Sequence, residues 1–439
     1  MRRKARKGGG RQVEVTIETL GGRGDGVARH EGQPVFVPFA LPGERVRLRL
    51  TGRGQAGIRA ELLELVSESP ERVTPPCPHF GACGGCTVQH LAEPAYRRWT
   101  RDLVVQALAR RGFDAPPVAA PVFVGAGHRR RATLAARRQG RTVAVGFHPR
   151  ASHAIEDIRE CQVLVPEITA LLPALRTALP ALLAEGERAD ITVLASETGL
   201  DVLVASPTPP GLAAREALAA LAQEADLARL SWGAAGPGGA APESEPEPVA
   251  IRRAPLLTFT GVAVEPPPGA FVQPTAAGEA ALLAIAHQAL AGVAGPVADL
   301  FAGLGPFTFG LAERHRVHAV EGTETAIAAL WRAARRHDRA GRVTAETRDL
   351  ARAPLTAAEL APFAGVVLDP PRIGARAQAE ALAESAVGTV VALSCNPGSF
   401  ARDARTLADG GYTLESVTPL DQFPWTGHLE LAAVFRRPA

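Results

Sequence analysis

The sequence has no run of about 18 consecutive apolar residues, the length that a membrane-spanning helix needs, although 46% of its 439 residues are hydrophobic. Its basic tail, residues 1–11, lacks the apolar stretch of a secretory signal. Lysine occurs only at positions 4 and 7, and aromatic residues make up only 5%. Charged residues, at 21%, are as frequent as in ordinary soluble globular proteins. We therefore expect a cytoplasmic protein that makes no membrane contact and has roughly two to four domains.

The positive charge is concentrated in two segments, although the formal net charge is only +3. The basic tail holds six basic side chains and no acid, and residues 97–150 hold twelve arginines against Asp102 and Asp114. The tightest cluster runs from His128 to Arg131. Such segregation is the pattern expected for a polyanionic partner such as a nucleic acid. A solvated basic face is the alternative.

Local patterns divide the rest of the chain into three regions. Residues 12–67 alternate as short strands between glycine-rich turns, which predicts a small OB-like β-barrel. Residues 68–265 hold a cysteine cluster, the arginine-rich stretch and further strand patterns, which predicts a central α+β domain. Within them, the tract from Gly233 to Val249 has no periodicity and predicts a disordered loop. Residues 266–439 alternate between helix and strand patterns, which predicts an α/β Rossmann-like domain with a parallel sheet.

The five cysteines are an odd number, which argues against a disulfide framework in a chain without a secretory signal. Cys77, Cys83 and Cys86 form a glycine-rich C-x5-C-x2-C pattern, and Cys161 offers a fourth thiolate from a distant part of the chain. Four thiolates suit a [4Fe-4S] cluster or a structural zinc ion. The spacing is looser than in usual zinc pairs and favours the cluster, while buried thiols without a ligand are the third alternative. Cys395 is then left over for catalysis.

A glycine-rich turn, Phe301-Ala302-Gly303-Leu304-Gly305, ends a predicted buried strand. Such a turn allows the backbone to approach a nucleotide-like ligand closely. Glu321 ends the next strand, where its carboxylate is placed to accept both ribose hydroxyls. Asp349 follows a third strand and is placed either to accept a hydrogen bond from an adenine amino group or to cap a helix. A dinucleotide-binding fingerprint would need glycine at position 308, where Thr308 stands.

Two further polar runs end later strands of the same region. Asp369-Pro370-Pro371-Arg372 follows one buried strand, and Ser394-Cys395-Asn396-Pro397 follows the next. Because ligands bind at the carboxyl ends of the strands in such sheets, both runs should converge with the glycine-rich turn on one crevice. A cysteine in that crevice, beside Asp369 and Arg372, is poised for covalent chemistry.

Together with the segment from Phe423 to Glu430, these runs resemble the S-adenosylmethionine-dependent RNA (uracil-5-)-methyltransferases. The likeness covers most of the chain. Residues 12–67 resemble the TRAM barrel of the ribosomal-RNA branch of that family, and the four cysteines at 77, 83, 86 and 161 resemble its [4Fe-4S] site. Phe271-Val272-Gln273 resembles the segment that opens its catalytic domain. Any one motif could arise by chance, whereas the ordered set is highly specific.

The resemblance implies that Cys395 adds to carbon 6 of uracil and that Glu430 later removes the proton from carbon 5. The metal cluster would order the central domain rather than carry electrons, because this reaction is redox-neutral. Ala302, Pro306 and Thr275 differ from residues that are common in the family, which bears on single cofactor contacts and not on the reaction class. The implied cofactor site, for S-adenosylmethionine, is lined by Gln273, Phe301, Gly303, Gly305, Glu321, Asp349 and Asp369.

The implied substrate is a uridine in RNA, which must leave its stack to reach Cys395. The barrel, the basic tail and the Arg129–Arg131 cluster are expected to grip this RNA. The resemblance favours 23S ribosomal RNA over transfer RNA, because the bacterial tRNA branch lacks both barrel and cluster. A non-catalytic RNA-binding or ribosome-assembly protein is one alternative. A methyltransferase acting on nitrogen is another, although it would need no covalent adduct. No feature indicates an obligate protein partner.

Overall fold

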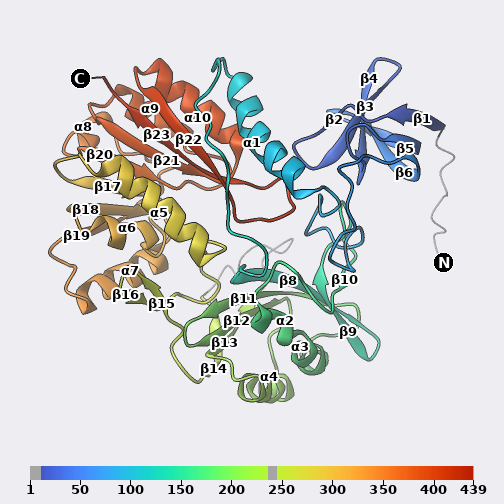
Figure 1. The fold of residues 1–439 in the computed structure, drawn as a ribbon. Coiled ribbons are helices and arrows are strands. Elements are labelled where there is room, and N and C mark those ends of the chain that lie inside the picture. The colour runs from blue at the N-terminus through green and yellow to red at the C-terminus, as the bar shows by residue number, and fades with distance from the viewer. Residues whose placement is uncertain (1–10, 236–244, 439) are drawn as a thin grey trace.

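The computed structural model describes residues 11–235 and 245–438, which form three large sheets and their covering helices (Figure 1). Of the basic tail, only Arg11 belongs to the described residues. None of the helices in the described part of the chain is long and apolar enough to cross a membrane.

The first sheet has six strands in the order β1-β5-β6-β4-β3-β2. Alternate residues of β4 and β5 are buried, among them Val35, Val37, Val46 and Leu48, because one face of each strand packs on the interior of this unit. The strand patterns predicted here are confirmed. The strands are β1 (Gln12–Thr16), β2 (Thr19–Leu20), β3 (Asp25–His30), β4 (Gln33–Pro38), β5 (Arg45–Gly54) and β6 (Gly57–Ser67).

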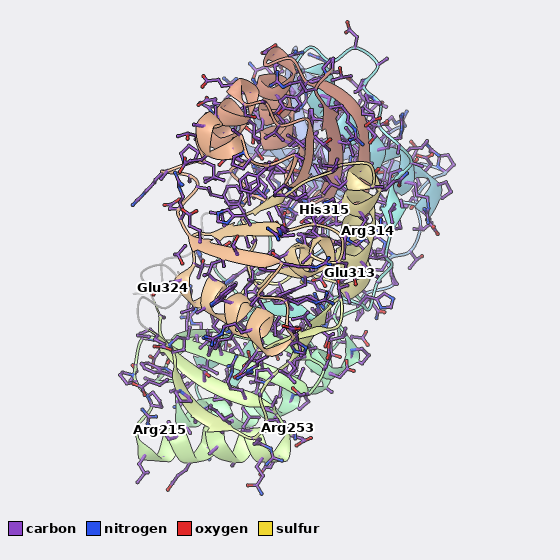
Figure 2. The ribbon with its side chains drawn as sticks, turned by 90° about the vertical axis from the view of Figure 1, so that its left-hand side faces the viewer. Arg215, Arg253, Glu313, Arg314, His315 and Glu324 are labelled. Carbon is purple, nitrogen blue, oxygen red and sulfur yellow. The ribbon has the colours of Figure 1, made fainter. Side chains whose placement is uncertain are left out.

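The second sheet has seven strands in the order β10-β9-β8-β11-β12-β13-β14. Its strands are β8 (Arg131–Gln139), β9 (Thr142–Phe147), β10 (Glu156–Asp157), β11 (Arg188–Ser196), β12 (Gly199–Ser206), β13 (Arg229–Ala234) and β14 (Glu247–Ile251). Helices α2 (Pro166–Ala170), α3 (Leu172–Ala178) and α4 (Leu212–Glu224) and the 3-10 turn η1 (Leu179–Ala181) pack on one face. Figure 2 labels Arg215 on α4 and Arg253 beyond β14 on this unit.

The tract from Gly233 to Val249 differs in part from the predicted disordered loop. Its ends belong to β13 and β14, which pair antiparallel across the tract. Periodicity within the tract fails to reveal these strands because only the last two residues of β13 and the first three of β14 fall inside it. Residues 236–244, the middle of the tract, lie outside the described residues.

The third sheet has eight strands in the order β19-β18-β17-β20-β21-β23-β22-β7. The strands β17 to β21 pair in parallel, and β23 inserts antiparallel beside β21. Its strands are β7 (Val122–Phe123), β17 (Val297–Leu300), β18 (Val317–Glu321), β19 (Val343–Thr347), β20 (Gly365–Leu368), β21 (Thr389–Ser394), β22 (Thr413–Asp421) and β23 (Glu430–Arg436). A separate two-stranded ribbon, β15 (Leu257–Phe259) and β16 (Val262–Val264), precedes β17 in the chain.

Helices cover both faces of the third sheet, as the alternating pattern predicts. One face carries α5 (Ala276–Leu290), α6 (Pro306–Leu311) and α7 (Glu324–Arg336). The other carries α1 (Glu93–Ala109), α8 (Ala357–Leu360), α9 (Arg376–Glu384) and α10 (Pro397–Asp409). Because α1 and β7 join this sheet, a segment from the amino-terminal half of the chain helps to build the carboxyl-terminal unit (Figure 1).

Candidate active site

The strand order of the third sheet reverses at β17. The chain moves from β17 to β18 and β19 on one side and then returns to β20 and β21 on the other. Such a reversal opens a crevice at the carboxyl ends of the two central strands, because the helices that follow them cover opposite faces. The glycine-rich turn follows β17 and Asp369 follows β20, so both lie at this crevice.

The glycine-rich turn has left-handed backbone at Phe301, Gly303 and Gly305, with φ of 64°, 55° and 87°. A Cβ at Gly305 would lie 2.9 Å from the Phe309 ring and 3.0 Å from Leu330, so this glycine allows α6 to pack on α7. A Cβ at Gly303 would meet nothing within 4 Å. The turn therefore presents its backbone to open space at Gly303, which gives a ligand room to approach.

Glu321, the last residue of β18, reaches back to this turn. One carboxylate oxygen accepts a hydrogen bond from the Gly303 N–H at 3.1 Å, and the other accepts one from the Thr323 N–H at 2.7 Å. The structure thus brings Gly303 and Glu321 together. Each oxygen still has a lone pair that could accept a ligand hydroxyl.

Asp349 lies beyond the end of β19 and is exposed. Its Oδ1 accepts a hydrogen bond from the Ala351 N–H at 3.0 Å. The alternative that Asp349 caps a helix is wrong, because the next helix, α8, is capped by Thr356. A turn that bonds its own aspartate leaves that carboxylate facing solvent at the rim of the crevice.

Asp299 is a buried acid that the motifs did not single out. It lies inside β17 and accepts a hydrogen bond from Thr308 Oγ1 at 2.5 Å, while its Oδ1 has no partner among the described residues. Burial raises the pKa of Asp299 to about 7. Thr308 thus ties α6 to β17 at the position where a dinucleotide fold would place glycine. The available signal was an acid in the middle of an apolar strand.

A chain of hydrogen bonds reaches Asp369 from the start of α5. Gln273 donates from Nε2 to Asp369 Oδ2 at 2.8 Å, and its Oε1 accepts from Gln422 Nε2 at 3.0 Å. Gln422 Oε1 accepts in turn from Thr275 Oγ1 at 3.0 Å. Gln422 was not predicted as a site residue. All three residues that hold Asp369 in this way are at most 3% exposed, so its position is fixed from within the protein.

Strand pairing brings Cys395 and Glu430 together. In the antiparallel register of β21 and β23, Ser394 is opposite Leu431. Cys395 follows Ser394 and Glu430 precedes Leu431, so the two side chains belong to the next facing pair of positions. Residues 35 positions apart in the sequence therefore meet at the carboxyl end of β21.

The charges around Cys395 are mostly negative. Burial, and then the carboxylates of Glu430 and Asp369, raises the pKa of its thiol to about 11, while Arg372 lowers it. Glu430 is 3% exposed and its Oε2 has no partner among the described residues. Burial followed by the charge of Asp369 raises the pKa of Glu430 to about 8. The site thus holds one thiol and two carboxylates that resist being charged together.

Arg372 and Cys395 are held on two loops that bond each other. The Arg372 carbonyl accepts hydrogen bonds from Asn396 Nδ2 at 3.1 Å and from Ser399 Oγ at 3.0 Å. Asn396 also caps α10, with its Oδ1 accepting from the Gly398 N–H at 3.0 Å. The predicted convergence of the two polar runs is confirmed, and these contacts fix the cysteine at the helix start.

The other four cysteines form a second group of thiols. Cys77, Cys83, Cys86 and Cys161 all carry free thiols, and each is partly buried. Burial is the main cause that raises the pKa of Cys83, Cys86 and Cys161, and it brings the pKa of Cys86 to about 12. Neighbouring thiols of the same group raise these pKa values further, so the cysteines lie close together. No three His, Cys, Asp or Glu side chains within residues 11–235 and 245–438 are arranged to hold a metal ion.

The Arg129–Arg131 cluster turns inward, unlike the predicted phosphate grip. Arg130 donates to Glu279 Oε2 at 2.7 Å and to the Gln273 carbonyl at 3.1 Å, and Arg131 donates to the Ala270 carbonyl at 2.9 Å. The prediction is wrong for these two residues, because charge density along a sequence does not reveal internal acceptors. They brace the segment that carries Gln273 instead.

Comparisons with known proteins show the family that the chain resembles along its length. Residues 262–437 match the family model described as tRNA (uracil-5-)-methyltransferase, and residues 6–52 match the TRAM domain. An uncharacterized RNA methyltransferase of Rhizobium meliloti is 42% identical over 96% of this chain and 99% of its own length. The 23S rRNA (uracil(1939)-C(5))-methyltransferase RlmD of Chromohalobacter salexigens is 37% identical over 96% of this chain and 89% of its own.

The fold also matches a solved structure along nearly the whole chain. The tRNA (uracil-54, C5)-methyltransferase of Pyrococcus abyssi, in complex with S-adenosyl-L-homocysteine, covers 96% of this chain and 100% of its own, with a TM-score of 0.75 and 24% identity. At that identity the match bears on the fold: an amino-terminal TRAM β half-barrel and a Rossmann-like methyltransferase sheet.

Proposed function

The chain belongs to the RNA (uracil-5-)-methyltransferase family, with a TRAM domain, and is an S-adenosylmethionine-dependent enzyme that methylates carbon 5 of uracil in RNA; we propose that its target is a uridine of 23S ribosomal RNA and that Cys395 and Glu430 carry the reaction. The observation that carries the proposed chemistry is the facing position of Cys395 and Glu430 across β21 and β23.

Carbon 5 of uracil is a poor nucleophile until a group adds at carbon 6. In the proposed first step the Cys395 thiol passes its proton to the neighbouring Asp369 carboxylate, its sulfur bonds to carbon 6, and the electron pair of the ring double bond moves to the carbonyl as an enolate. Arg372 lowers the pKa of this thiol and so favours the attacking thiolate. S-adenosylmethionine supplies the methyl group that carbon 5 then receives.

Release of the product needs a base. Glu430 takes the proton from carbon 5, the ring double bond re-forms, and the carbon–sulfur bond breaks so that its electron pair returns to Cys395. The burial that raises the pKa of Glu430 to about 8 gives this carboxylate the basicity that such a step requires. Asp369, whose charge acts on both groups, then returns its proton to the Cys395 sulfur.

The proposed cofactor site is the crevice at the strand reversal. Gly303 leaves space beside the backbone, Gly305 lets the turn pack closely against α6 and α7, and the Glu321 carboxylate is held next to Gly303. These groups fit a nucleoside, whose ribose hydroxyls need acceptors. Phe301 and Asp349 would border the same ligand. Gln273 and Asp369, which bond each other, would form the side of the site that faces Cys395.

We assign the four-cysteine group to a [4Fe-4S] cluster. Four thiols that influence one another's pKa are a ligand set for either a [4Fe-4S] cluster or a zinc ion, and the loose C-x5-C-x2-C spacing favours the cluster. The cysteine loop packs closely on the chain beyond β9, because the Gly84 N–H donates to the His148 carbonyl at 3.0 Å and a Cβ at Gly84 would lie 2.4 Å from that oxygen. The cluster would tie residues 77–86 to Cys161 in the central domain.

The proposed domains are 12–67, 68–265 and 266–439, preceded by the basic tail 1–11. Helix α1 and strand β7 of the second domain pack on the sheet of the third, so that the two are tightly joined. The choice of ribosomal RNA depends on the 37% identity to an enzyme named for 23S rRNA. The fold alone favours neither RNA, since a tRNA enzyme shares it.

A trapping experiment tests the chemistry and the target together. Purified protein with S-adenosylmethionine should form a stable conjugate with 5-fluorouridine-containing 23S rRNA fragments. Carbon 5 of 5-fluorouridine carries fluorine in place of hydrogen, so the base finds no proton to remove and the cysteine is not released. The Cys395→Ala variant should form none. Mass spectrometry of RNA from a deletion strain should locate the missing methyl group in 23S rRNA. A methyl missing from transfer RNA instead would overturn the target, and a conjugate that persists in Cys395→Ala would overturn the mechanism.

A further inference from the structure

The loop between β22 and β23 leads directly into Glu430 and is held by groups from distant parts of the chain. It contains Trp425, whose φ of 61° is left-handed and costly for a bulky side chain. Such backbone strain persists only where the surroundings hold it in place. The groups that hold Trp425 therefore also influence the position of the Glu430 carboxylate at the end of the loop.

Tyr96 of α1 bridges the two ends of this loop's first turn. Its hydroxyl donates a hydrogen bond to Asp421 Oδ2 at 2.7 Å and accepts one from the Trp425 N–H at 2.9 Å. Tyr96 is 6% exposed and Asp421 is 3% exposed, so water does not replace these bonds. Asp421 Oδ1 accepts in addition from the Phe423 N–H at 3.1 Å.

The segment after Cys86 holds the other side of Trp425. The Trp425 carbonyl accepts hydrogen bonds from the Thr87 N–H at 2.8 Å and the Val88 N–H at 3.1 Å. The strained residue is thus bound through both its N–H and its carbonyl by residues more than 300 positions away in the chain.

The first sheet touches the same loop. A Cβ at Gly427 would lie 2.2 Å from the Gly22 carbonyl oxygen, so the loop and the barrel turn are in direct backbone contact. The Arg129 guanidinium lies 5.3 Å from the centre of the Phe423 ring and also faces Cys86 and Cys161 electrostatically. Barrel, cysteine segment and α1 therefore converge on one loop of the catalytic sheet.

We propose that Tyr96 is a positioning residue that acts through Trp425 to hold the Glu430 carboxylate over carbon 5 of the bound uracil, and that the cysteine-bearing segment shares this task. The inference rests on the proposed role of Glu430. Because Cys395 is held separately, by Asn396 and the Arg372 loop, loss of the Tyr96 bridge should affect proton removal and leave formation of the adduct intact.

The Tyr96→Phe variant of the full-length protein tests this separation of steps. It keeps the ring and deletes one oxygen. Tyr412→Phe is the matched control, because the chain has two tyrosines and the Tyr412 hydroxyl is also buried, donating to the Val387 carbonyl at 2.7 Å far from the loop. Two rates are measured for each variant: conjugate formation with 5-fluorouridine RNA, and methyl turnover on ordinary RNA.

The expected result for Tyr96→Phe is conjugate formation within about twofold of wild type and turnover lowered about tenfold or more, the loss typical of a hydrogen bond to a charged group. The covalent methylated intermediate should then accumulate on ordinary RNA and appear on a denaturing gel. Tyr412→Phe should change neither rate by more than about twofold, even if both variants lose similar thermal stability.

Two outcomes overturn the inference. In one, Tyr96→Phe slows both rates equally, which is the result of a general loosening of the fold. In the other, it turns over as fast as wild type. If the wild-type protein itself forms no conjugate, the proposed function fails, and that result is distinguishable because it does not involve the variant.

Discussion

Cys395 and Cys86 carry free thiols whose pKa values are raised to about 11 and about 12, yet their surroundings differ in kind. Cys86 has three other cysteines as its charged neighbours, so that several thiolates there would need a cationic group between them. Cys395 has two carboxylates and one arginine beside it, a set that can exchange protons. A raised pKa alone does not distinguish a thiol that binds a metal from one that acts as a nucleophile, whereas the charged groups around the thiol do.

The largest expected effect comes from removing the nucleophile. Cys395→Ala should lower methylation of RNA at least about a thousandfold, because no other group supplies the bond to carbon 6. Iron content and thermal stability should stay close to wild type, since Cys395 is not part of the four-thiol group. Methyl transfer from labelled S-adenosylmethionine measures the loss. Appreciable activity in this variant would place the nucleophile elsewhere.

Cys86→Ser sharpens the contrast from the other side. It should lose most of its iron and sulfide and lower the midpoint of thermal unfolding by several degrees, because a ligand of the proposed cluster is missing. Methylation should fall less than in Cys395→Ala, through the displaced Thr87 and Val88 that hold Trp425. Iron analysis and calorimetry measure these changes. A variant with full iron content would contradict the assignment of Cys86.

The pH dependence of turnover tests the paired carboxylates. Glu430 must be unprotonated to take the carbon 5 proton, so turnover should rise as pH increases through its raised pKa of about 8. The charge of Asp369 contributes to that raised pKa; hence Asp369→Asn should move the rise to lower pH by about one unit. Asn still offers an oxygen to Gln273. If turnover in Asp369→Asn rises at the same pH as in wild type, the charge of Asp369 does not act on the pKa of Glu430.

The sequence predicts those parts of the site that depend on local strand endings, and it misses contacts between residues far apart in the chain. The turn at Gly303, the carboxylate of Glu321 and the loops of Asp369 and Cys395 follow from local strand endings, and the structure has them at one edge of the sheet. Contacts that depend on packing escape sequence patterns. Tyr96 meets Asp421 across 325 positions, and Arg130 meets Glu279 across 149, so neither pair leaves a periodic signal.

The smallest expected effect concerns Arg372, a cation beside Cys395. Arg372→Gln should raise the pKa of that thiol further, because the favourable charge is lost while Glu430 and Asp369 remain. At a pH below the thiol pKa, each rise in that pKa lowers the thiolate fraction in the same proportion. Alkylation of Cys395 by iodoacetamide at pH 8 should therefore slow about two- to threefold, the size of effect typical for an exposed charge. Peptide mass spectrometry resolves Cys395 from the other thiols.

The matched control for this change is Arg215→Gln, which removes a partly exposed arginine of α4 that pairs with Glu247 (Figure 2). Its removal alters the net charge by the same amount, yet it should leave alkylation of Cys395 unchanged. Equal rates for Arg372→Gln and wild type would mean that the arginine does not act on the thiol. Activation of the nucleophile would then fall to the bound substrate and to the proton exchange among Cys395, Glu430 and Asp369.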